Sequence, residues 1–302
     1  TICYEKDNEL HLIHANELDK KEKFNQHNIL IKQEDYTIEN IDNVIYAVEE
    51  ILIDKVYLPV YFNYREAKND GFTVVLNGQG SDEVWLGYIF NWNIFNYTHK
   101  TDDLNKLIEE YYLPNIIFKD KLNAKFKENI MQTLKKYLKD TLEVYSKKEN
   151  DDKLNDYSIM SLKTILHDLL LQEDKLAMAH SVESRVPFVD DHKLVELSMQ
   201  MPGNLKIKDG REKYILRQYG KDKLPKSIIQ RKKYAFPEPP NVYDAMIKKL
   251  CQENWQEISK CKILNEIIDK RFWKDINLFS NRELWWLLVY WRFDNVFKME
   301  EI

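Results

Sequence analysis

Hydrophobic and polar positions along the chain alternate with two different periods, which predicts strands interleaved with helices. The clearest case is residues 73–76, a short β-branched run that predicts a buried strand. The run stops at a Gly-x-Gly turn, and the apolar residues after it predict a helix with Ser81 or Asp82 as its N-cap. In an open α/β sheet, the loop at the carboxyl end of such a strand is where ligands bind.

Similar patterns predict the elements on either side of this turn. We expect strands at residues 2–4 and 27–31, and helices over 9–24, 41–53 and 59–68, the second capped after Thr37 and the third ended by Gly71. Strands that alternate with helices in this way predict parallel βαβ units, and so an α/β fold.

The second half of the chain is predicted to be largely helical. Residues 89–148 predict amphipathic helices interrupted at Pro114, and the charged run 147–153 predicts a solvated linker. A long helix is expected over 156–179. The tail 281–297 is apolar on most faces, which predicts a buried helix, with a partner-binding aromatic stripe as the alternative.

Composition narrows the class of protein. Of the 302 residues, 44% are hydrophobic and 13% aromatic, which excludes general disorder. The net charge of −5 arises from 45 basic and 50 acidic residues, so neither a nucleic-acid partner nor a membrane surface is expected. The three cysteines lack metal-ligand spacing, which argues against a zinc site or a disulfide framework and favours the cytoplasm.

The acidic pair Asp82–Glu83 after the Gly-x-Gly turn has two interpretations. The carboxylates could cap the helix and complement its dipole. They could instead hold Mg²⁺, an ion that prefers oxygen ligands and would bridge the loop to a phosphate.

Two further stretches carry candidate chemistry. Residues 172–190 contain Lys175, His180, Glu183 and Arg185 beside apolar residues. Taken singly, Lys175 and Glu183 could be surface charges, Glu183 and Arg185 a structural ion pair, and His180 a satisfied local hydrogen-bonding group. Residues 210–236 contain the basic triplet 231–233. These side chains could be solvated surface charges. They could instead bind pyrophosphate, because cations stabilise the charge on a departing polyphosphate.

Together the three stretches resemble the synthetase domain of asparagine synthetase, whose relatives include β-lactam synthetase and the lasso-peptide cyclases. The resemblance covers nearly the whole chain, in the order and spacing of the family. It rests on Asn77-Gly78-Gln79-Gly80-Ser81-Asp82-Glu83 with Gly87-Tyr88, on Asp174-Lys175 with the run from Met178 to Asp190, and on Lys213, Leu216-Arg217, Leu224-Pro225 and Arg231-Lys232-Lys233-Tyr234-Ala235-Phe236.

The resemblance implies a parallel-sheet ATP-pyrophosphatase fold, of the adenine nucleotide alpha hydrolase type, with a large helical C-terminal part. The whole of 1–302 would be one synthetase domain, with its α/β core at about 1–90 and 155–210 and its helical portions at about 91–150 and 211–302. It also implies a ligase that activates a carboxylate as an acyl-adenylate with ATP and Mg²⁺, releases pyrophosphate, and joins an amine to form an amide.

The resemblance further implies roles for individual residues. Asp82 and Glu83 match the acidic pair near Mg²⁺ and pyrophosphate. Lys175 matches a lysine near the nucleotide, Glu183 a glutamate that supports the base at the attacking amine, and Lys233 a lysine that stabilises charge on the adenylate and the leaving phosphate. Gln79, together with these three, makes up the expected catalytic set; the residues expected to bind ATP and pyrophosphate are Asn77, Gly78, Gln79, Gly80, Ser81, Arg231 and Lys233.

The sequence departs from the family pattern in three places, and these departures change what we expect of ATP binding and of the nitrogen source. The phosphate loop Ser-Gly-Gly-x-Asp-Ser is missing, and residues 1–4 match the second strand of the family's sheet, so we expect that loop just upstream of Thr1. As given, the chain is expected to bind ATP poorly or not at all. The cysteine-initiated glutaminase domain is also missing, and Asn77 stands where the family has Ser.

Three hypotheses follow for function. The first is synthesis of asparagine from aspartate, ATP and ammonia, the ammonia supplied from glutamine by a glutaminase domain or subunit, in a protein that could form a homodimer. The second is amide or ring closure on a peptide or natural product by the same chemistry. The third is a noncatalytic member that acts as a scaffold.

Overall fold

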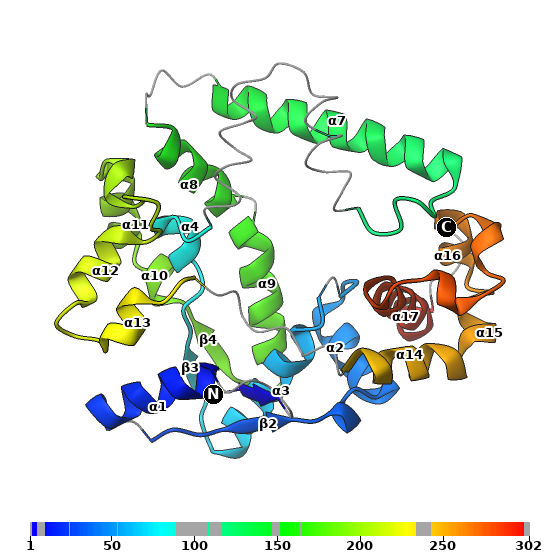
Figure 1. Cartoon of the computed structure of the whole chain (residues 1–302), viewed down its shortest axis with the longest axis horizontal. Helices are drawn as coiled ribbons and strands as arrows, with labels where there is room; N and C mark the ends of the chain where they lie inside the picture. The colour runs from blue at the N-terminus through cyan, green and yellow to red at the C-terminus, as the bar shows by residue number, and fades with distance from the viewer. Residues whose placement is uncertain are drawn as a thin grey trace.

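The computed structural model describes residues 2–4, 10–23, 25–52, 54–88, 108, 116–146, 152–163, 165–233 and 243–298. Over these residues it is a mixed α/β structure in which helices surround two short pairs of parallel strands (Figure 1). The predicted parallel pairing is confirmed.

Each pair of strands is joined by helices, as parallel strands require. In the first, β1 (Ile2–Tyr4) lies beside β2 (Ile29–Ile31), with α1 (Leu10–Glu22) between them in sequence. In the second, β3 (Val74–Leu76) lies beside β4 (Glu183–Arg185), and Val74 is opposite Glu183. The sequence did not indicate β4, whose three residues are all polar.

The prediction that residues 73–76 form a buried strand is wrong in one respect. The strand forms, but Val74 is 37% exposed and Leu76 is 68% exposed. Val74 and Leu76 lie on the same face of the strand, so the described residues leave this face partly uncovered.

The early helices follow the predicted signals with shifted ends. Thr37 caps α2 (Ile38–Val48), because its Oγ1 accepts the Asn40 N–H at 3.1 Å. The helix ends before the predicted residue 53, since Glu49 takes a left-handed conformation with φ of 58°. The next helix, α3 (Tyr57–Asn69), is followed by Gly71 at φ of 84°.

The remaining helices confirm part of the predicted pattern. Most of residues 89–115 and 147–151, where we predicted helices around Pro114 and a charged linker, lie outside the described residues. The predicted helix over 156–179 corresponds to two α-helices, one on each side of residue 164.

The remaining α-helices among the described residues have the following bounds: α4 (Ser81–Trp85), α7 (Ala124–Ser146), α8 (Lys153–Lys163), α9 (Ile165–Met178), α10 (Pro187–Asp190), α11 (His192–Gln200), α12 (Tyr214–Gly220), α13 (Lys226–Gln230), α14 (Asp244–Glu253), α15 (Trp255–Ile258), α16 (Lys262–Ile267) and α17 (Asn281–Phe297).

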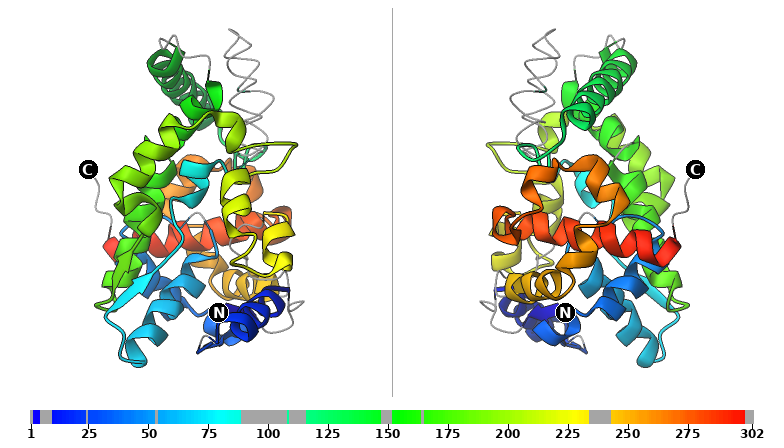
Figure 2. Two further views of the ribbon diagram at one scale, coloured as in Figure 1. Left: turned by 90° about the vertical axis from the view of Figure 1, so that its left-hand side faces the viewer. Right: turned by 90° about the vertical axis from the view of Figure 1, so that its right-hand side faces the viewer.

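The C-terminal helix α17 is the centre of the main hydrophobic core, as predicted for the tail. It packs against α2, α14 and α16, and the two side views show it running across the body of the molecule (Figure 2). Its start is defined by a capping box in which Ser280 and Glu283 exchange hydrogen bonds. Arg292 on this helix binds Asp42 of α2 through two contacts of 2.7 Å each, which ties the C-terminal helix to the N-terminal half.

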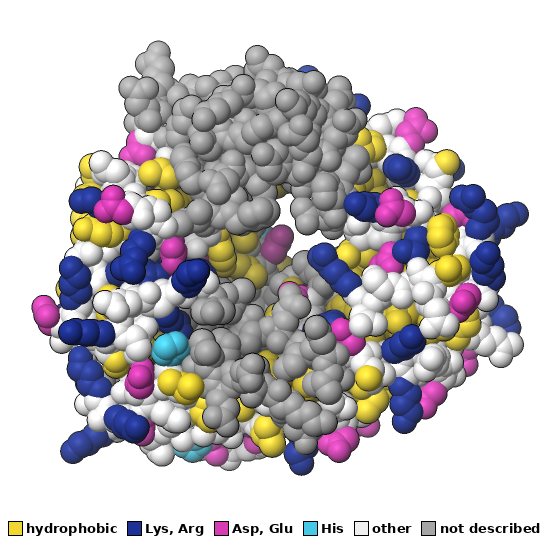
Figure 3. Space-filling model, viewed as in Figure 1, with side chains coloured by type: hydrophobic (Ala, Val, Ile, Leu, Met, Phe, Trp, Pro, Cys, Tyr) yellow, Lys and Arg dark blue, Asp and Glu magenta, His cyan; other side chains and the backbone are white. Residues whose placement is uncertain are grey.

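On the coloured part of the face in Figure 3, basic and acidic side chains are interspersed. The helix α7 lies along one margin of the molecule (Figures 1 and 2). No helix within the described residues is both long and apolar enough to cross a membrane.

We predict that Leu288→Ala lowers the free energy of unfolding by about 2–5 kcal/mol, because Leu288 is fully buried in α17 and its truncation leaves a cavity. Urea denaturation measures the change. The matched control is Leu197→Ala, at a leucine that is 49% exposed, and we expect a loss below about 1 kcal/mol there. Equal losses at the two positions would contradict the assignment of α17 to the core.

Candidate active site

The loop between β3 and α4 has a backbone conformation that requires glycine. After Leu76 the ladder continues by one hydrogen bond, from the Asn77 N–H to the Arg185 carbonyl at 3.0 Å. Gly80 then takes a φ of 81°, and a Cβ on it would lie 2.4 Å from Val189 Cγ1. Only glycine therefore fits this turn, and the chain enters α4 directly after it.

The predicted helix cap is wrong. Gly80 occupies the N-cap position and Ser81 is the first helical residue. The Ser81 hydroxyl accepts a hydrogen bond from Lys213 Nζ at 2.5 Å, so it faces a lysine from another part of the chain. The Ser81 side chain therefore contacts a lysine from a distant segment and does not cap its own helix.

Asp82 lies between two lysine side chains. Lys213 Nζ is 2.9 Å from Asp82 Oδ1, and Lys233 Nζ is 3.3 Å from Asp82 Oδ2. Lys213 directly precedes α12, and Lys233 follows α13, so two segments distant from the loop in sequence converge on one carboxylate. The structure thus brings together Ser81, Asp82 and Lys233, three of the residues that the sequence singled out.

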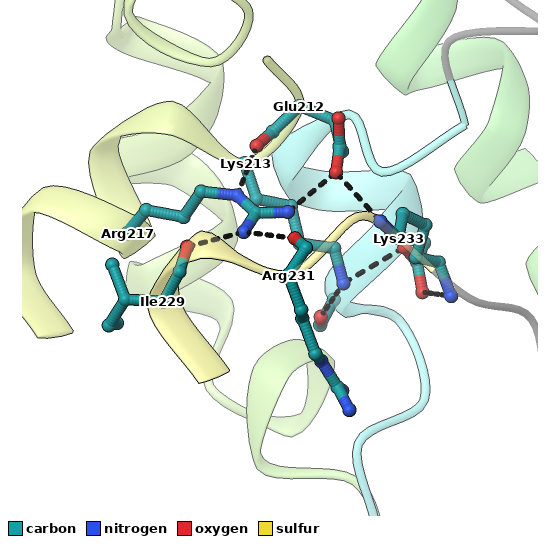
Figure 4. A network of polar contacts seen from close by, with 8 residues as sticks. Glu212, Lys213, Arg217, Ile229, Arg231 and Lys233 are labelled. Carbon is teal, nitrogen blue, oxygen red and sulfur yellow. Dashed lines mark hydrogen bonds and ion pairs between the residues drawn. The ribbon is translucent and has the colours of Figure 1, made fainter. Parts of the chain in front are cut away.

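A second layer of contacts holds the lysines in place (Figure 4). Glu212 accepts hydrogen bonds from Arg217 Nη2 at 2.5 Å and from the Lys233 N–H at 3.2 Å. Arg217 Nη1 also donates to the carbonyl oxygens of Ile229 and Arg231, at 2.6 and 2.9 Å. The Arg231 side chain, expected at the phosphate site, is exposed and extends away from this network in Figure 4.

Burial governs the electrostatics of the site. Glu83 is only 2% exposed, and burial raises the pKa of its carboxyl, with a smaller upward effect from Asp82. Its Oε1 atom has no hydrogen-bond partner among the described residues. Burial likewise lowers the pKa of the Lys213 ammonium, and the charge of Asp82 opposes that change.

A second polar cluster lies against the same loop. The Asn77 side chain is hydrogen-bonded within a group that also contains Tyr64, Glu173 and Ser184. We call these four residues the Glu173 cluster. Its members come from the loop, α3, α9 and β4.

Two of the expected catalytic residues have other neighbours. Lys175 Nζ donates to the Val48 carbonyl at 2.7 Å and lies 3.1 Å from Glu49, both at the C-terminal end of α2. Glu183 is exposed and forms an ion pair with Arg185 at 2.7 Å, the structural pairing given as the alternative above. A catalytic role for either residue stays a prediction.

Two residues of the site were given no role from the sequence. Lys213 was part of the motif on which the family resemblance rests, three residues before Leu216-Arg217, but nothing local showed that it would reach Asp82. Glu173 lies between Gln172 and Asp174 on a helix that also carries Asp168, so no local signal distinguished it from its polar neighbours.

We predict that Gly87→Ala destabilises the protein. A Cβ on Gly87 would lie 1.7 Å from Asp82 Oδ1 and 2.6 Å from Lys213 Cε, so the ion pair must move. We expect a loss of about 1–3 kcal/mol in unfolding free energy, measured in urea. Gly78→Ala is the matched control, because a Cβ there meets no atom within 4 Å, and a similar loss in both variants would show that the close contact at Gly87 is unimportant.

Comparison with known proteins shows the family to which the chain is similar. The family model described as asparagine synthase matches residues 1–297. The chain is 27% identical to the glutamine-hydrolyzing asparagine synthetase 1 of Bacillus subtilis (strain 168), over 89% of this chain and 48% of that protein. It is 31% identical to asparagine synthetase 3 of the same organism, over 58% of this chain and 28% of that protein.

A vertebrate relative gives the same result. The glutamine-hydrolyzing asparagine synthetase of Gallus gallus is 26% identical over 70% of this chain and 29% of its own length. The chain thus spans about half, or less, of these curated relatives. Because the family model extends over almost the entire sequence, the chain belongs to the asparagine synthase family.

Proposed function

We propose that the chain forms the synthetase part of an ATP-dependent ligase that converts aspartate to asparagine, with ammonia derived from glutamine by a glutaminase domain or subunit. The carboxylate attacks the α-phosphate of ATP to form an acyl-adenylate and releases pyrophosphate. Ammonia then displaces AMP, and one proton is lost as the amide forms. The names of the relatives support the choice of substrates.

The observation that carries this proposal is the position of Asp82 between Lys213 and Lys233 after β3. Two ammonium groups held at one point form a fixed positive charge, which is suited to the negative charge that develops on a departing pyrophosphate. The loop 77–81 lies beside them, because Ser81 contacts Lys213, and it would contact the nucleotide.

The acidic pair fits a magnesium ion. Carboxylate oxygens are ligands that Mg²⁺ prefers, and the buried Glu83 Oε1 has no hydrogen-bond partner within the described part of the chain. Asp82 and Glu83 would hold the ion, and phosphate oxygens and water would complete its coordination, since no group of three metal-binding side chains occurs among the described residues. When bound, the ion would neutralise phosphate charge.

The strands support an ATP-pyrophosphatase-type core. Among the described residues, β1 pairs only with β2, and β3 only with β4, so both pairs have an edge that lacks a neighbour. A further parallel strand between β1 and β3 would join the pairs into one sheet and cover the exposed side of β3. In this family the phosphate loop ends such a strand, and we propose that the complete protein has it there, with the α/β core at about 1–90 and 155–210.

We predict that the complete protein catalyses aspartate-dependent exchange of pyrophosphate into ATP, and that Lys233→Ala lowers the rate about 10²- to 10³-fold, because a fixed cation is lost. Radiolabelled pyrophosphate measures the exchange. Lys232→Ala is the matched control, at an exposed neighbour, and should leave the rate within about twofold.

Two outcomes would contradict the proposal. Exchange with another carboxylate but not with aspartate, in a panel that includes peptide and amino-acid carboxylates, would overturn the substrate assignment. Tight Mg-ATP binding without exchange on any carboxylate would overturn the ligase assignment and favour a noncatalytic role.

A further inference from the structure

A tight turn at residues 208–211 precedes the first of the two lysines that meet Asp82. Its end residues exchange two backbone hydrogen bonds, of 3.1 and 2.9 Å. Asp209 and Gly210 between them have φ of 51° and 71°, and positive φ at both central positions is typical of a type I′ turn, for which Asp-Gly is a favoured sequence. The turn therefore fixes the point at which the chain continues into Lys213.

The backbone of Lys213 is held in a left-handed conformation, with φ of 51° and ψ of 36°. A residue other than glycine adopts this region at a cost in free energy, so its surroundings have to maintain it. The next residue, Tyr214, donates its N–H to the Lys206 carbonyl at 2.8 Å. The Lys213 ammonium group lies 2.5 Å from Ser81 Oγ and 2.9 Å from Asp82 Oδ1. An unfavourable conformation at a residue that reaches the site points to a functional requirement for the position of this lysine.

Glu212, the residue before Lys213, contacts the backbone of the second lysine. Its Oε1 accepts the Lys233 N–H at 3.2 Å and also accepts from Arg217 Nη2 at 2.5 Å (Figure 4). Arg217 Nε donates in turn to the Glu212 carbonyl oxygen at 2.9 Å. The Glu212 and Arg217 side chains are 13% and 15% exposed, so solvent ions screen this pair only partly. One carboxylate thus joins the position of Lys213 to that of Lys233.

This connection does not depend on what the ammonium groups bind. A lysine ends in a flexible four-carbon stem, so its charge keeps one place only where both the tip and the backbone have partners. The two tips meet at Asp82, at 2.9 and 3.3 Å. Glu212 contacts the Lys233 N–H, which leaves the ammonium group to other partners. Glu212 can therefore hold the pair of cations in place while a phosphate replaces Asp82 at their tips.

Glu212 could instead serve only the stability of the fold, as an ion pair with Arg217. That interpretation depends on charge, because removing one charge of a partly buried pair weakens it. A positioning role depends on the length of the side chain, because the Lys233 N–H needs an acceptor at hydrogen-bond distance. Length and charge can be changed separately at this position, so the two interpretations predict opposite orders for two substitutions.

We propose that Glu212 is a positioning residue for the release of pyrophosphate: it fixes the Lys233 backbone relative to Lys213, so that the two ammonium groups receive the departing phosphates at a set spacing. The inference rests on the proposed function and adds a residue that acts through its neighbours. Preorganised charge lowers the barrier because it does not have to reorganise as the reaction proceeds. A shift of about 1 Å in such a group costs on the order of 100-fold in rate.

The test compares two substitutions at Glu212 in the complete protein. Glu212→Gln keeps the length of the side chain and an acceptor oxygen but removes the charge, whereas Glu212→Asp keeps the charge and is one methylene shorter. We expect aspartate-dependent pyrophosphate exchange to stay within about threefold in the Gln variant and to fall about 10- to 100-fold in the Asp variant. The loss should appear in the maximal rate or in KM for pyrophosphate, with KM for aspartate within about twofold of its original value.

Asp42→Asn is the matched control. Asp42 binds Arg292 through two contacts of 2.7 Å each, and these side chains are 27% and 16% exposed. The substitution removes a charge from a comparable ion pair outside the site. We expect it to lower the free energy of unfolding in urea while the exchange rate stays within about twofold.

A double variant shows whether Glu212 acts through Lys233. In the Lys233→Ala background the ammonium group that Glu212 positions is absent, so Glu212→Asp should lower exchange by less than about threefold further. An independent effect on the fold would reduce the rate by the same factor in both backgrounds. All rates are referred to the folded fraction measured by circular dichroism, which removes any loss that is due to unfolding.

The outcomes distinguish the two levels of the argument. If the unmodified protein shows no exchange with aspartate, the proposed function fails and this inference falls with it. If exchange is normal but the Asp variant is as fast as the Gln variant or faster, only the positioning role is overturned. The same conclusion follows if Glu212→Asp costs an equal factor with and without Lys233.

Discussion

The contact of one carboxylate with two lysines is the constraint on which the site depends. Asp82 must lie between Lys213 and Lys233 because the two ammonium groups repel each other and are partly removed from water. The backbone makes this possible in two places. Gly80 allows the turn that directs α4 toward the lysines, and Gly87 gives space for the Lys213 side chain.

The same contact explains why helices distant in sequence are held together. Arg217 and Glu212 have no role at Asp82 themselves, yet they connect α12 with the segment after α13 and so fix the backbone at Lys233. A phosphate group that replaced Asp82 as the partner of the lysines would meet donors that are already in position. Such preorganisation is what makes electrostatic stabilisation effective, since little reorganisation accompanies the reaction.

The loop 77–81 joins two clusters with different chemistry. Ser81 begins the part that faces cations, which suits phosphate, whereas the Asn77 side chain is hydrogen-bonded in a group with Tyr64, Glu173 and Ser184. Both sets of contacts therefore fix side chains of the same short loop.

The sequence by itself determined the parallel α/β arrangement, the cap at Thr37, the buried helix α17 and the loop with its acidic pair, because these follow from periodicity and from glycine and capping chemistry over a few neighbouring residues. The motifs also determined the family, since they recur in a recognisable order. Only the tertiary structure decided that Ser81 bonds to Lys213 instead of capping its helix, that Lys233 reaches Asp82, and that Lys175 reaches α2. Each of these depends on which segments far apart in sequence meet, and no local pattern specifies the distance between two side chains that come from different elements.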